Sequence, residues 1–121
     1  MVLVDTSVWI SHLRDGNPDL MMLLNNGDAA CHPFIIGELA CGNIRNRKEI
    51  LGLLESLPIS EKAVHREVLE FIDINELMGK GLGYIDMHLL ASSILSGFPI
   101  WTLDKALYKM AVKLKTAFLQ K

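Results

Sequence analysis

The sequence predicts an α/β fold with a mostly parallel sheet, and three observations lead to that prediction. Short apolar runs, such as Val2–Val4 and the segment IWTLD, alternate with longer stretches that have the apolar spacing of helices. Apart from Thr102, the residues before the closing aspartate of each run are apolar, as expected for strands that are buried on both faces. Helical stretches separate the runs, so crossover connections can join parallel strands.

Length and composition agree with one globular domain over residues 1–121. Half of the residues are hydrophobic and 21% are charged, and no apolar run approaches the ~20 residues of a membrane span. No basic region precedes the first apolar stretch, so we expect no signal peptide. Cys31 and Cys41 have no CxxC spacing. We expect both to be small buried hydrophobic residues in a reducing, cytoplasmic compartment.

The first elements follow directly from capping and breaking signals. Val2–Val4 is the first predicted strand, and Thr6 or Ser7 can cap the helix that follows it. The segment DGNPD breaks that helix. A second helix is expected from Leu20, and it ends at NNGD.

A second strand and two further helices are expected next. Residues 29–32 form a short strand, and Pro33 suits the first turn of a helix through FIIGELACG. Asn46 and Glu49 have the N-cap and N3 spacing that opens a helix. That helix continues through KEILGLLESL with an amphipathic pattern.

The second half of the chain repeats these signals. Ser60 is a capping residue before EKAVHREVLEFIDINELMGKG, which GLG ends. The stripe expected to face the core comprises Val64, Val68, Leu69, Ile72 and Leu77. A helix is expected from about Ile85 to Leu95, followed by SGFP, the run IWTLD, a helix KALYKMAVKL and TAFL as a candidate final strand.

Two of the short apolar runs end in an aspartate. Asp5 follows the first strand, and Asp104 closes PIWTLD. In open parallel sheets, ligands bind at the carboxyl ends of the strands, so we expect both side chains at the same edge. Each has a purely structural alternative: Asp5 can cap the following helix, and Asp104 can form a salt bridge with Lys105.

Two further acids lie in apolar surroundings. Glu38 lies within FIIGELAC, and Asp86 lies early in GLGYIDMHLLAS. Ionised carboxylates are rarely buried without a partner. Asp86 has an alternative role in complementing the helix dipole, whereas Glu38 has none. Other acids, such as Glu61 and Glu67, share a stretch with many charges and are interpreted as a solvated face.

Four carboxylates at one sheet edge would repel one another and raise one another's pKa. A hard divalent cation removes this conflict, because Mg²⁺ and Mn²⁺ prefer oxygen ligands. Two such ions can stabilise the attacking and the leaving oxygen in phosphodiester hydrolysis. Zinc would require His or Cys ligands, and the histidines show no ligand spacing. We expect structural or surface roles for His12, His32, His65 and His88.

The order and surroundings of the four acids resemble the PIN-domain ribonucleases, and among them the VapC-type toxins of prokaryotic toxin–antitoxin pairs. LVDTSVWI looks like the opening strand of that family with its first acid, Asp5. FIIGELACG looks like the helix with the second acid, Glu38. GLGYIDMHLLASSILSGFPIWTLDKAL looks like the closing block, with Asp86, Thr102 and Asp104. The resemblance covers essentially the whole chain.

This resemblance implies a three-layer PIN-like fold in which helices flank a mostly parallel sheet of four or five strands. It implies an endoribonuclease that depends on one or two Mg²⁺ or Mn²⁺ ions, with RNA as substrate and a small antitoxin protein as partner. It also implies a homodimer, in line with the positive mean hydropathy.

The resemblance further assigns roles to individual residues. The metal ligands that it implies are Asp5, Asp86 and Asp104. Glu38 would complete the metal shell or position the attacking water. Ser7 and Thr102 would support the site by orienting a carboxylate or a coordinated water through their hydroxyl groups.

The charge balance neither favours nor excludes an RNA substrate. Twelve Lys and Arg residues face fourteen Asp and Glu residues, for a formal net charge of −2, and two divalent ions would reverse its sign. Basic residues gather in RNRK and on one face of the last helix. The candidate RNA contacts are Arg45, Arg47, Lys48, Lys105 and Lys109. A solvated helix face is the alternative for the lysines.

Three functions are alternatives to a VapC-type ribonuclease. A phosphatase of the haloacid-dehalogenase kind needs a second aspartate two residues after the first, and Ser7 occupies that position. A non-catalytic PIN-like binding module would tend to lose acids, whereas this chain keeps all four. A PIN nuclease of general RNA processing stays open. We also hypothesise that part of the apolar stretch on the first two helices forms a groove that leads a partner to the carboxylates, with core positions as the alternative. The stretch comprises Trp9, Ile10, Leu13, Leu20, Met21, Met22, Leu23 and Leu24.

Overall fold

The computed structural model describes residues 1–119 and confirms the predicted parallel α/β architecture. The elements in chain order are β1 (Val2–Val4), α1 (Thr6–Asp15), α2 (Pro18–Asn25), β2 (Ala29–Ala30), α3 (Pro33–Ala40), α4 (Arg47–Ser56), α5 (His65–Ile74), α6 (Tyr84–Ser96), β3 (Ile100–Trp101) and α7 (Lys105–Lys113). Alternation of short strands with helices, which the sequence predicts, is therefore the arrangement of the described chain.

The three strands form one parallel sheet in the order β2-β1-β3. Leu3 of β1 is opposite Ala30 of β2 on one side and Ile100 of β3 on the other. Because β1 is the central strand, the residues that follow β1 and β3 leave the sheet side by side at its carboxyl edge. The first and last strands of the chain are thus neighbours.

The number of strands differs from the expected four or five. Two isolated parallel bridges extend the sheet: Cys31 pairs with Ile59 beyond β2, and Ile100 pairs with Ala117 beyond β3. Each of these outer segments makes two backbone hydrogen bonds, one on either side of the bridge residue. The TAFL segment thus lies beside β3 as expected, but a single bridge does not make it a strand.

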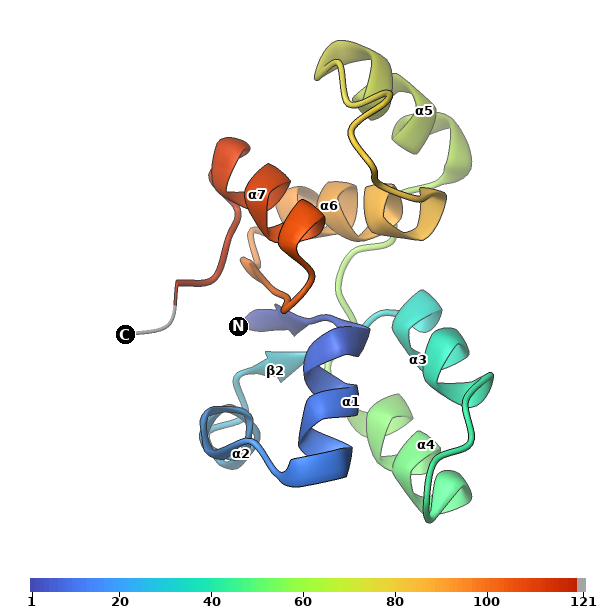
Figure 1. Cartoon of the computed structure of the whole chain (residues 1–121), viewed down its shortest axis with the longest axis vertical. Helices are drawn as coiled ribbons and strands as arrows, with labels where there is room; N and C mark the ends of the chain where they lie inside the picture. Colours follow the sequence, from blue (N-terminus) through green and yellow to red (C-terminus); the bar gives the residue numbers. More distant parts are fainter. Residues whose placement is uncertain (120–121) are drawn as a thin grey trace.

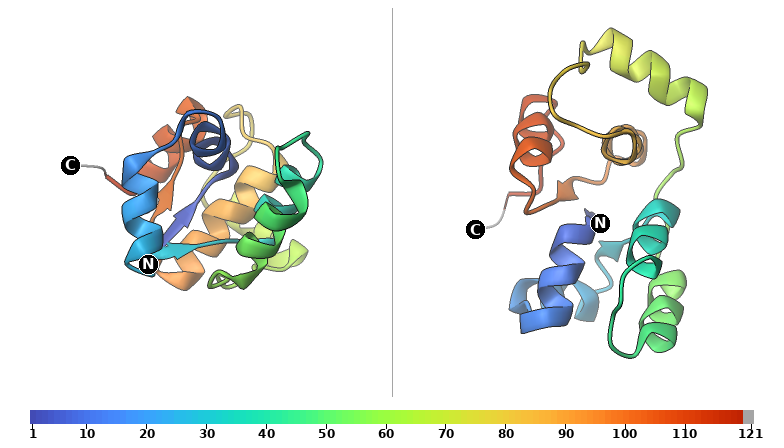
Figure 2. Two further views of the ribbon diagram at one scale, coloured as in Figure 1. Left: turned by 90° about the horizontal axis from the view of Figure 1, so that it is seen from below. Right: turned by 45° about the vertical axis from the view of Figure 1, so that its right-hand side comes forward.

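Helices cover both faces of the sheet, as a three-layer fold requires. Figure 1 shows α6 and α7 above β1 and α1 below it, and Figure 2 shows the same separation from another side. Leu3 and Val4 are fully buried between these layers. The middle of α6 is buried too, from Met87 to Ser93. Each such Leu or Val contributes roughly 1.5–3 kcal/mol relative to an exposed position.

Local capping explains where several helices begin. Pro18 and Pro33 each occupy the first turn of a helix, as the sequence predicts for Pro33. Asn17 accepts hydrogen bonds from two backbone N–H groups of α2, and His32 accepts one from the N–H of Phe34. By contrast, Asn46 precedes α4 with a φ of 55° and forms no side-chain cap. The predicted capping role of Asn46 is therefore wrong.

The segment between α4 and α5 is the part that differs most from expectation. α5 begins at His65 instead of directly after Ser60, which is buried in the outer bridge of the sheet. Of the predicted core stripe, Val68 and Leu77 are buried and Ile72 is half-buried. The other two members of the stripe, Val64 and Leu69, are exposed. The helix starts later and packs only one narrow face on α6.

No helix in residues 1–119 is long and apolar enough to cross a membrane.

Candidate metal-binding and catalytic site

The site begins where β1 and β3 end together. The backbone N–H of Asp5 donates to the carbonyl of Trp101 at 2.9 Å, so the β1–β3 ladder continues to the first acid. Thr102 follows Trp101 directly and lies beside Asp5. The prediction that the strand-end acids share one edge of the sheet depends on this pairing, which the structure contains.

Asp5 is a buried carboxylate held by two hydroxyl groups. Asp5 is only 6% exposed. It occupies the N-cap position of α1, but its side chain makes no capping hydrogen bond. Ser7 Oγ donates to Oδ2 at 2.8 Å and Thr102 Oγ1 donates to the same oxygen at 2.7 Å. Within residues 1–119 no hydrogen bond reaches Oδ1. The carboxylate is thus fixed by one oxygen, and the other oxygen can take a ligand.

The same two hydroxyls also shape the loop that carries Asp104. Thr102 Oγ1 accepts from the backbone N–H of Asp104 at 3.1 Å, and Ser7 Oγ accepts from that of Leu103 at 2.9 Å. Asp104 itself is exposed, and its Oδ1 accepts from the N–H of Leu107 at 2.9 Å. Asp104 therefore caps α7, and no ion pair with Lys105 occurs in the described part of the chain.

Glu38, like Asp104, is an exposed member of the acidic set. It lies on α3, and its Oε1 accepts from Thr6 Oγ1 at 2.7 Å. The apolar residues around it in the sequence point to the core from other faces of the helix, as Ile35 and Leu39 do. The sequence predicts a helix cap at Thr6 or Ser7, but Asp5 occupies the N-cap position of α1. Thr6 instead joins α1 to α3 through this contact, which the sequence does not reveal.

Asp86 connects the four acids electrostatically. It lies in the first turn of α6, is half-buried, and accepts a 3.3 Å hydrogen bond from the N–H of Gly83. Burial raises the pKa of Asp86, the bond from Gly83 opposes that rise, and the charges of Asp5, Asp104 and Glu38 raise the pKa further. Each of the other three predicted acids thus lies within electrostatic reach of Asp86.

The donor set fits a hard divalent cation that keeps part of its water shell. Every candidate ligand is a carboxylate oxygen, and one oxygen of the buried Asp5 has no hydrogen-bond partner in residues 1–119. In the same residues, no three His, Cys, Asp or Glu side chains lie close enough to enclose an ion directly. Mg²⁺ usually takes one or two carboxylates and retains several waters, so a loose cluster suits it.

The predicted RNA-contacting residues are all exposed, and one of them, Arg47, already makes hydrogen bonds within the protein. Arg47 donates from Nε and Nη2 to the carbonyl of Ala40, at 3.2 and 2.9 Å, and so closes the C-terminus of α3. The other four candidates are Arg45, Lys48, Lys105 and Lys109. Lys105 and Lys109 lie on α7, directly after Asp104.

The histidines have the structural roles that the sequence predicts. His12 Nδ1 accepts from the N–H of Asn17 at 3.0 Å, and His32 caps α3. His65 Nδ1 and Tyr84 Oη share a 2.5 Å hydrogen bond. His88 is buried, and neither ring nitrogen has a hydrogen-bond partner in the described residues. A lowered pKa, caused first by burial, keeps His88 neutral near pH 7.

The two cysteines differ. Cys31 is buried, and burial raises the pKa of its thiol to about 11, as expected for a small hydrophobic residue. Cys41 is exposed at the end of α3, so the expectation of burial is wrong there.

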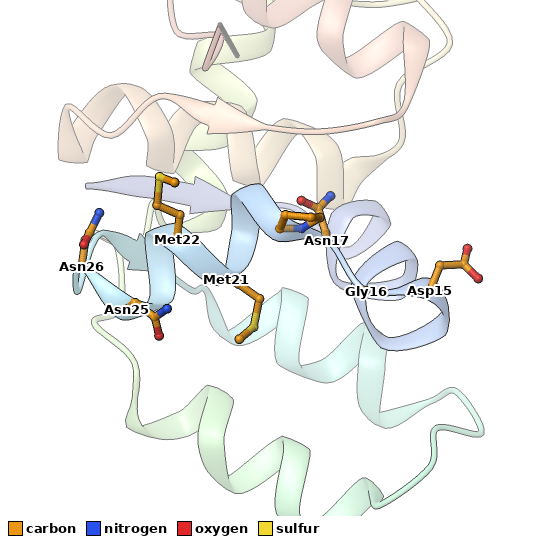
Figure 3. A pocket seen from close by; sticks show the side chains of 8 residues that line it. Asp15, Gly16, Asn17, Met21, Met22, Asn25 and Asn26 are labelled. Atoms are coloured by element: carbon orange, nitrogen blue, oxygen red, sulfur yellow. The ribbon is translucent and has the colours of Figure 1, made fainter.

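Met21 and Met22 do not lie beside the acids. Both side chains are exposed, and they line a hollow of about 620 Å³ between the end of α1 and α2 (Figure 3). None of the four carboxylates belongs to the lining of that hollow. A groove that does include one of them, Glu38, lies instead between α3 and α6. The methionines are thus surface residues, and the hollow that they line does not include the carboxylates.

A parallel sheet with four acids at its carboxyl edge defines a class of protein, and comparison of the sequence with known families agrees. The PIN-domain family model matches residues 2–113. The chain belongs to the PIN-domain family.

Among characterised proteins, the chain is similar to Ribonuclease VapC32 of Mycobacterium tuberculosis, in the strains CDC 1551 / Oshkosh and ATCC 25618 / H37Rv. Each is 45% identical over 108 residues, which cover 88% of this chain and 87% of the relative. The resemblance to VapC-type PIN proteins is thus confirmed.

The Thr102→Val substitution should weaken divalent-ion binding. Valine keeps the shape of the side chain but removes the hydroxyl that holds both Asp5 Oδ2 and the N–H of Asp104. Loss of a group that orients a ligand typically costs about 10–100-fold in metal affinity. We expect a Kd for Mn²⁺ about tenfold higher by isothermal titration calorimetry, with Thr102→Ser as the control that keeps the hydroxyl. An unchanged Kd in folded Thr102→Val would show that the hydroxyl does not organise the site.

His32 should make the fold sensitive to mild acid. Burial, followed by the charges of His88 and Lys62, lowers the pKa of His32 from 6.5 to about 4. Between these values only the unfolded chain takes up the proton, so stability is lost as pH falls from 6.5 toward 4. The loss attributable to His32 is on the order of 3 kcal/mol.

The His32→Asn variant tests this assignment. Asparagine can still accept from the N–H of Phe34 but does not titrate. Urea unfolding at pH 7 and pH 4.5 should show a smaller loss of stability in the variant than in the wild type. Equal losses in the two proteins would contradict the role of His32.

Proposed function

We propose that this chain is a VapC-type endoribonuclease that hydrolyses phosphodiester bonds in RNA with Mg²⁺ or Mn²⁺, as the toxin of a toxin–antitoxin pair. The observation that carries the proposal is the buried Asp5, held by Ser7 and Thr102, together with Asp86, whose carboxylate feels the charges of Asp5, Asp104 and Glu38. The family and the 45% identity to proteins named Ribonuclease VapC32 support the same activity.

Asp5, Asp86 and Asp104 are the residues proposed to hold the divalent ions. One or two such ions, when bound, would neutralise the phosphate and stabilise the attacking and leaving oxygens. Ser7 and Thr102 keep Oδ2 of Asp5 in place, which leaves Oδ1 directed to a ligand. The repulsion that raises the pKa of Asp86 falls when a cation binds, so ion binding also stabilises the fold.

Glu38 is proposed to position the attacking water and take its proton. Thr6 fixes Oε1 of Glu38, and the exposed carboxylate retains Oε2 for a second hydrogen bond. The water oxygen forms the new bond to phosphorus as the bond to the leaving ribose oxygen breaks. Lys105 and Lys109, on the helix that Asp104 caps, are proposed to contact phosphates beside the site, together with Arg45 and Lys48.

An antitoxin partner, a cytoplasmic location and a single domain over residues 1–121 belong to this proposal. The alternative of general RNA processing predicts the same chemistry without a dedicated protein inhibitor. The two are distinguished by the adjacent reading frame: a small protein with a DNA-binding half and an amphipathic tail supports the toxin. A non-catalytic binding module is disfavoured, because all four acids and their hydrogen-bond partners are present.

Asp5→Asn should abolish divalent-dependent cleavage of RNA while the fold remains intact. The amide can still accept one hydroxyl, but it removes the charge at the centre of the proposed site. In the wild type, Mn²⁺ should raise the Tm and EDTA should stop cleavage, and in the variant Mn²⁺ should leave the Tm nearly unchanged. Asp73→Asn, on the solvated face of α5, is the matched control. Full activity of Asp5→Asn with Mg²⁺ would refute the assignment.

We also propose a homodimer that forms through an apolar face on α5 and α6. The apolar side chains of this α5–α6 face are the exposed Ile74, Ile94 and Leu95 and the half-buried Phe71, which line one hollow between the two helices. Ile74 is 79% exposed, and Ile94 and Leu95 lie at the opposite end of α6 from Asp86. In Figure 1, α5 lies at the outer end of the molecule, on the side of α6 away from the sheet. Contiguous exposed apolar residues of this kind mark interaction surfaces.

Ile74→Glu should convert this dimer to a monomer, because it places a charge in the centre of the α5–α6 face. Light scattering at tens of micromolar should give the mass of two chains for the wild type and of one chain for the variant. Met22→Glu carries the same type of change on α2 and should leave the dimer intact. A wild type that is monomeric under these conditions would rule out the dimer.

A further inference from the structure

An apolar groove adjoins the acidic site between α3 and the start of α6. Its volume is about 350 Å³, and its lining includes Phe34, Gly37, Glu38, Cys41, Tyr84 and Ile85. We call it the α3–α6 groove. Glu38 belongs to both the groove and the acidic set, so a group bound in the groove lies next to the position proposed for the reacting phosphate.

Two aromatic rings line the groove, and contacts with neighbouring histidines hold them in place. Phe34 and Tyr84 are 36% and 44% exposed. The ring of buried His88 contacts both, with centroids 4.7 Å from Phe34 and 4.5 Å from Tyr84, in edge-on geometry. Tyr84 Oη is further fixed by His65, and Phe34 packs against His32 at 5.1 Å. Because these rings are already ordered, a ligand that stacks on them loses little conformational entropy.

The middle of the groove is open because α3 has a glycine there. A Cβ built on Gly37 would meet no atom within 4 Å. A larger residue at this position would be compatible with the helix and would fill the groove. The groove is therefore unfilled at position 37 because the residue there is glycine.

The charges around the groove select the chemistry of its occupant. Glu38 contributes a carboxylate at one end, and the remaining lining is apolar or neutral. An anionic phosphate is repelled there, whereas a flat uncharged ring is accepted. Single-stranded RNA presents both parts: its bases stack on aromatic side chains, and its phosphates follow the charged or metal-bearing surface.

We propose that the α3–α6 groove binds one nucleobase of the RNA substrate, stacked on Phe34 and Tyr84, beside the scissile phosphate. This inference rests on the proposed ribonuclease function and names how that site holds its substrate. Stacking tolerates any base, so the groove sets the position of the strand more than its sequence. Phe34 and Tyr84 are then substrate-positioning residues, and Glu38 lies between the bound base and the reaction.

The test uses short single-stranded RNAs of mixed sequence in which one nucleotide at a time lacks its base but keeps its phosphate. Binding is measured by fluorescence anisotropy in an Asp104→Asn background, chosen so that the RNA stays intact. One abasic position should weaken binding about tenfold. Phe34→Leu should bind the intact RNA about tenfold more weakly and should not respond to that abasic position. Tyr108→Leu, on α7, is the matched control and should behave like the parent.

A second variant keeps the test valid if Phe34→Leu fails to fold. Gly37→Leu leaves both rings in place and fills the groove, so it should lose the same abasic response without loss of stability. Parent-like affinities and abasic profiles in folded Phe34→Leu and Gly37→Leu would overturn the proposal, even if wild-type protein cleaves RNA. Absence of cleavage by the wild type would instead refute the ribonuclease function itself.

The thiol of Cys41 distinguishes RNA from a protein occupant. Cys41 is exposed in the groove and Cys31 is buried, so a thiol reagent modifies Cys41 selectively. The intact RNA should slow this modification severalfold, and the RNA with the critical abasic position should not. Protection by a protein partner with none by RNA would assign the groove to that partner and overturn the proposal.

Discussion

The hydrogen bond from Thr102 to Asp5 is the contact on which the site depends. It joins residues 97 apart in the sequence, and it exists because β1 and β3 are neighbouring parallel strands that end together. The same hydroxyl accepts from the backbone of Asp104 and so sets the turn that opens α7. Thr102 thus links the buried Asp5, the exposed Asp104 and α7, the helix that carries the candidate phosphate-binding lysines. A change in the β1–β3 register would separate all of them.

The acidic cluster is a charge arrangement that opposes folding unless a cation binds. Burial and three neighbouring carboxylates raise the pKa of Asp86, so its ionised form is disfavoured in the free protein. The fold tolerates this because each carboxylate accepts at least one hydrogen bond. The donors are Thr6 for Glu38, Gly83 for Asp86, Ser7 and Thr102 for Asp5, and Leu107 for Asp104. The hydrogen bonds hold the geometry, and a bound divalent ion would relieve the remaining repulsion. In the proposed function, stability and metal affinity are therefore linked.

Beside the cluster lies a surface of a different kind, made of aromatic rings and histidines. His88 is buried behind Phe34 and Tyr84, and His65 fixes the tyrosine hydroxyl. These residues come from α3, α5 and α6. The charged and the aromatic surfaces share Glu38. A polyanion with flat uncharged bases matches both surfaces at once, which is the physical basis for interpreting them as one substrate-binding region.

Local sequence patterns were sufficient to predict the alternation of strands and helices. They also identified the two strand-end acids, Asp5 and Asp104, and the other two acids, Glu38 and Asp86. These features depend on local patterns: the periodic spacing of apolar residues, Pro33 at the start of a helix, and carboxylates in otherwise apolar surroundings. Tertiary structure alone decided that Thr6 contacts Glu38, that Val64 and Cys41 are exposed, and that the outer sheet segments pair through single bridges. The reason is that propensity acts over a few residues. Which partner a hydroxyl or an apolar face meets is set by the packing of segments that are distant in the chain.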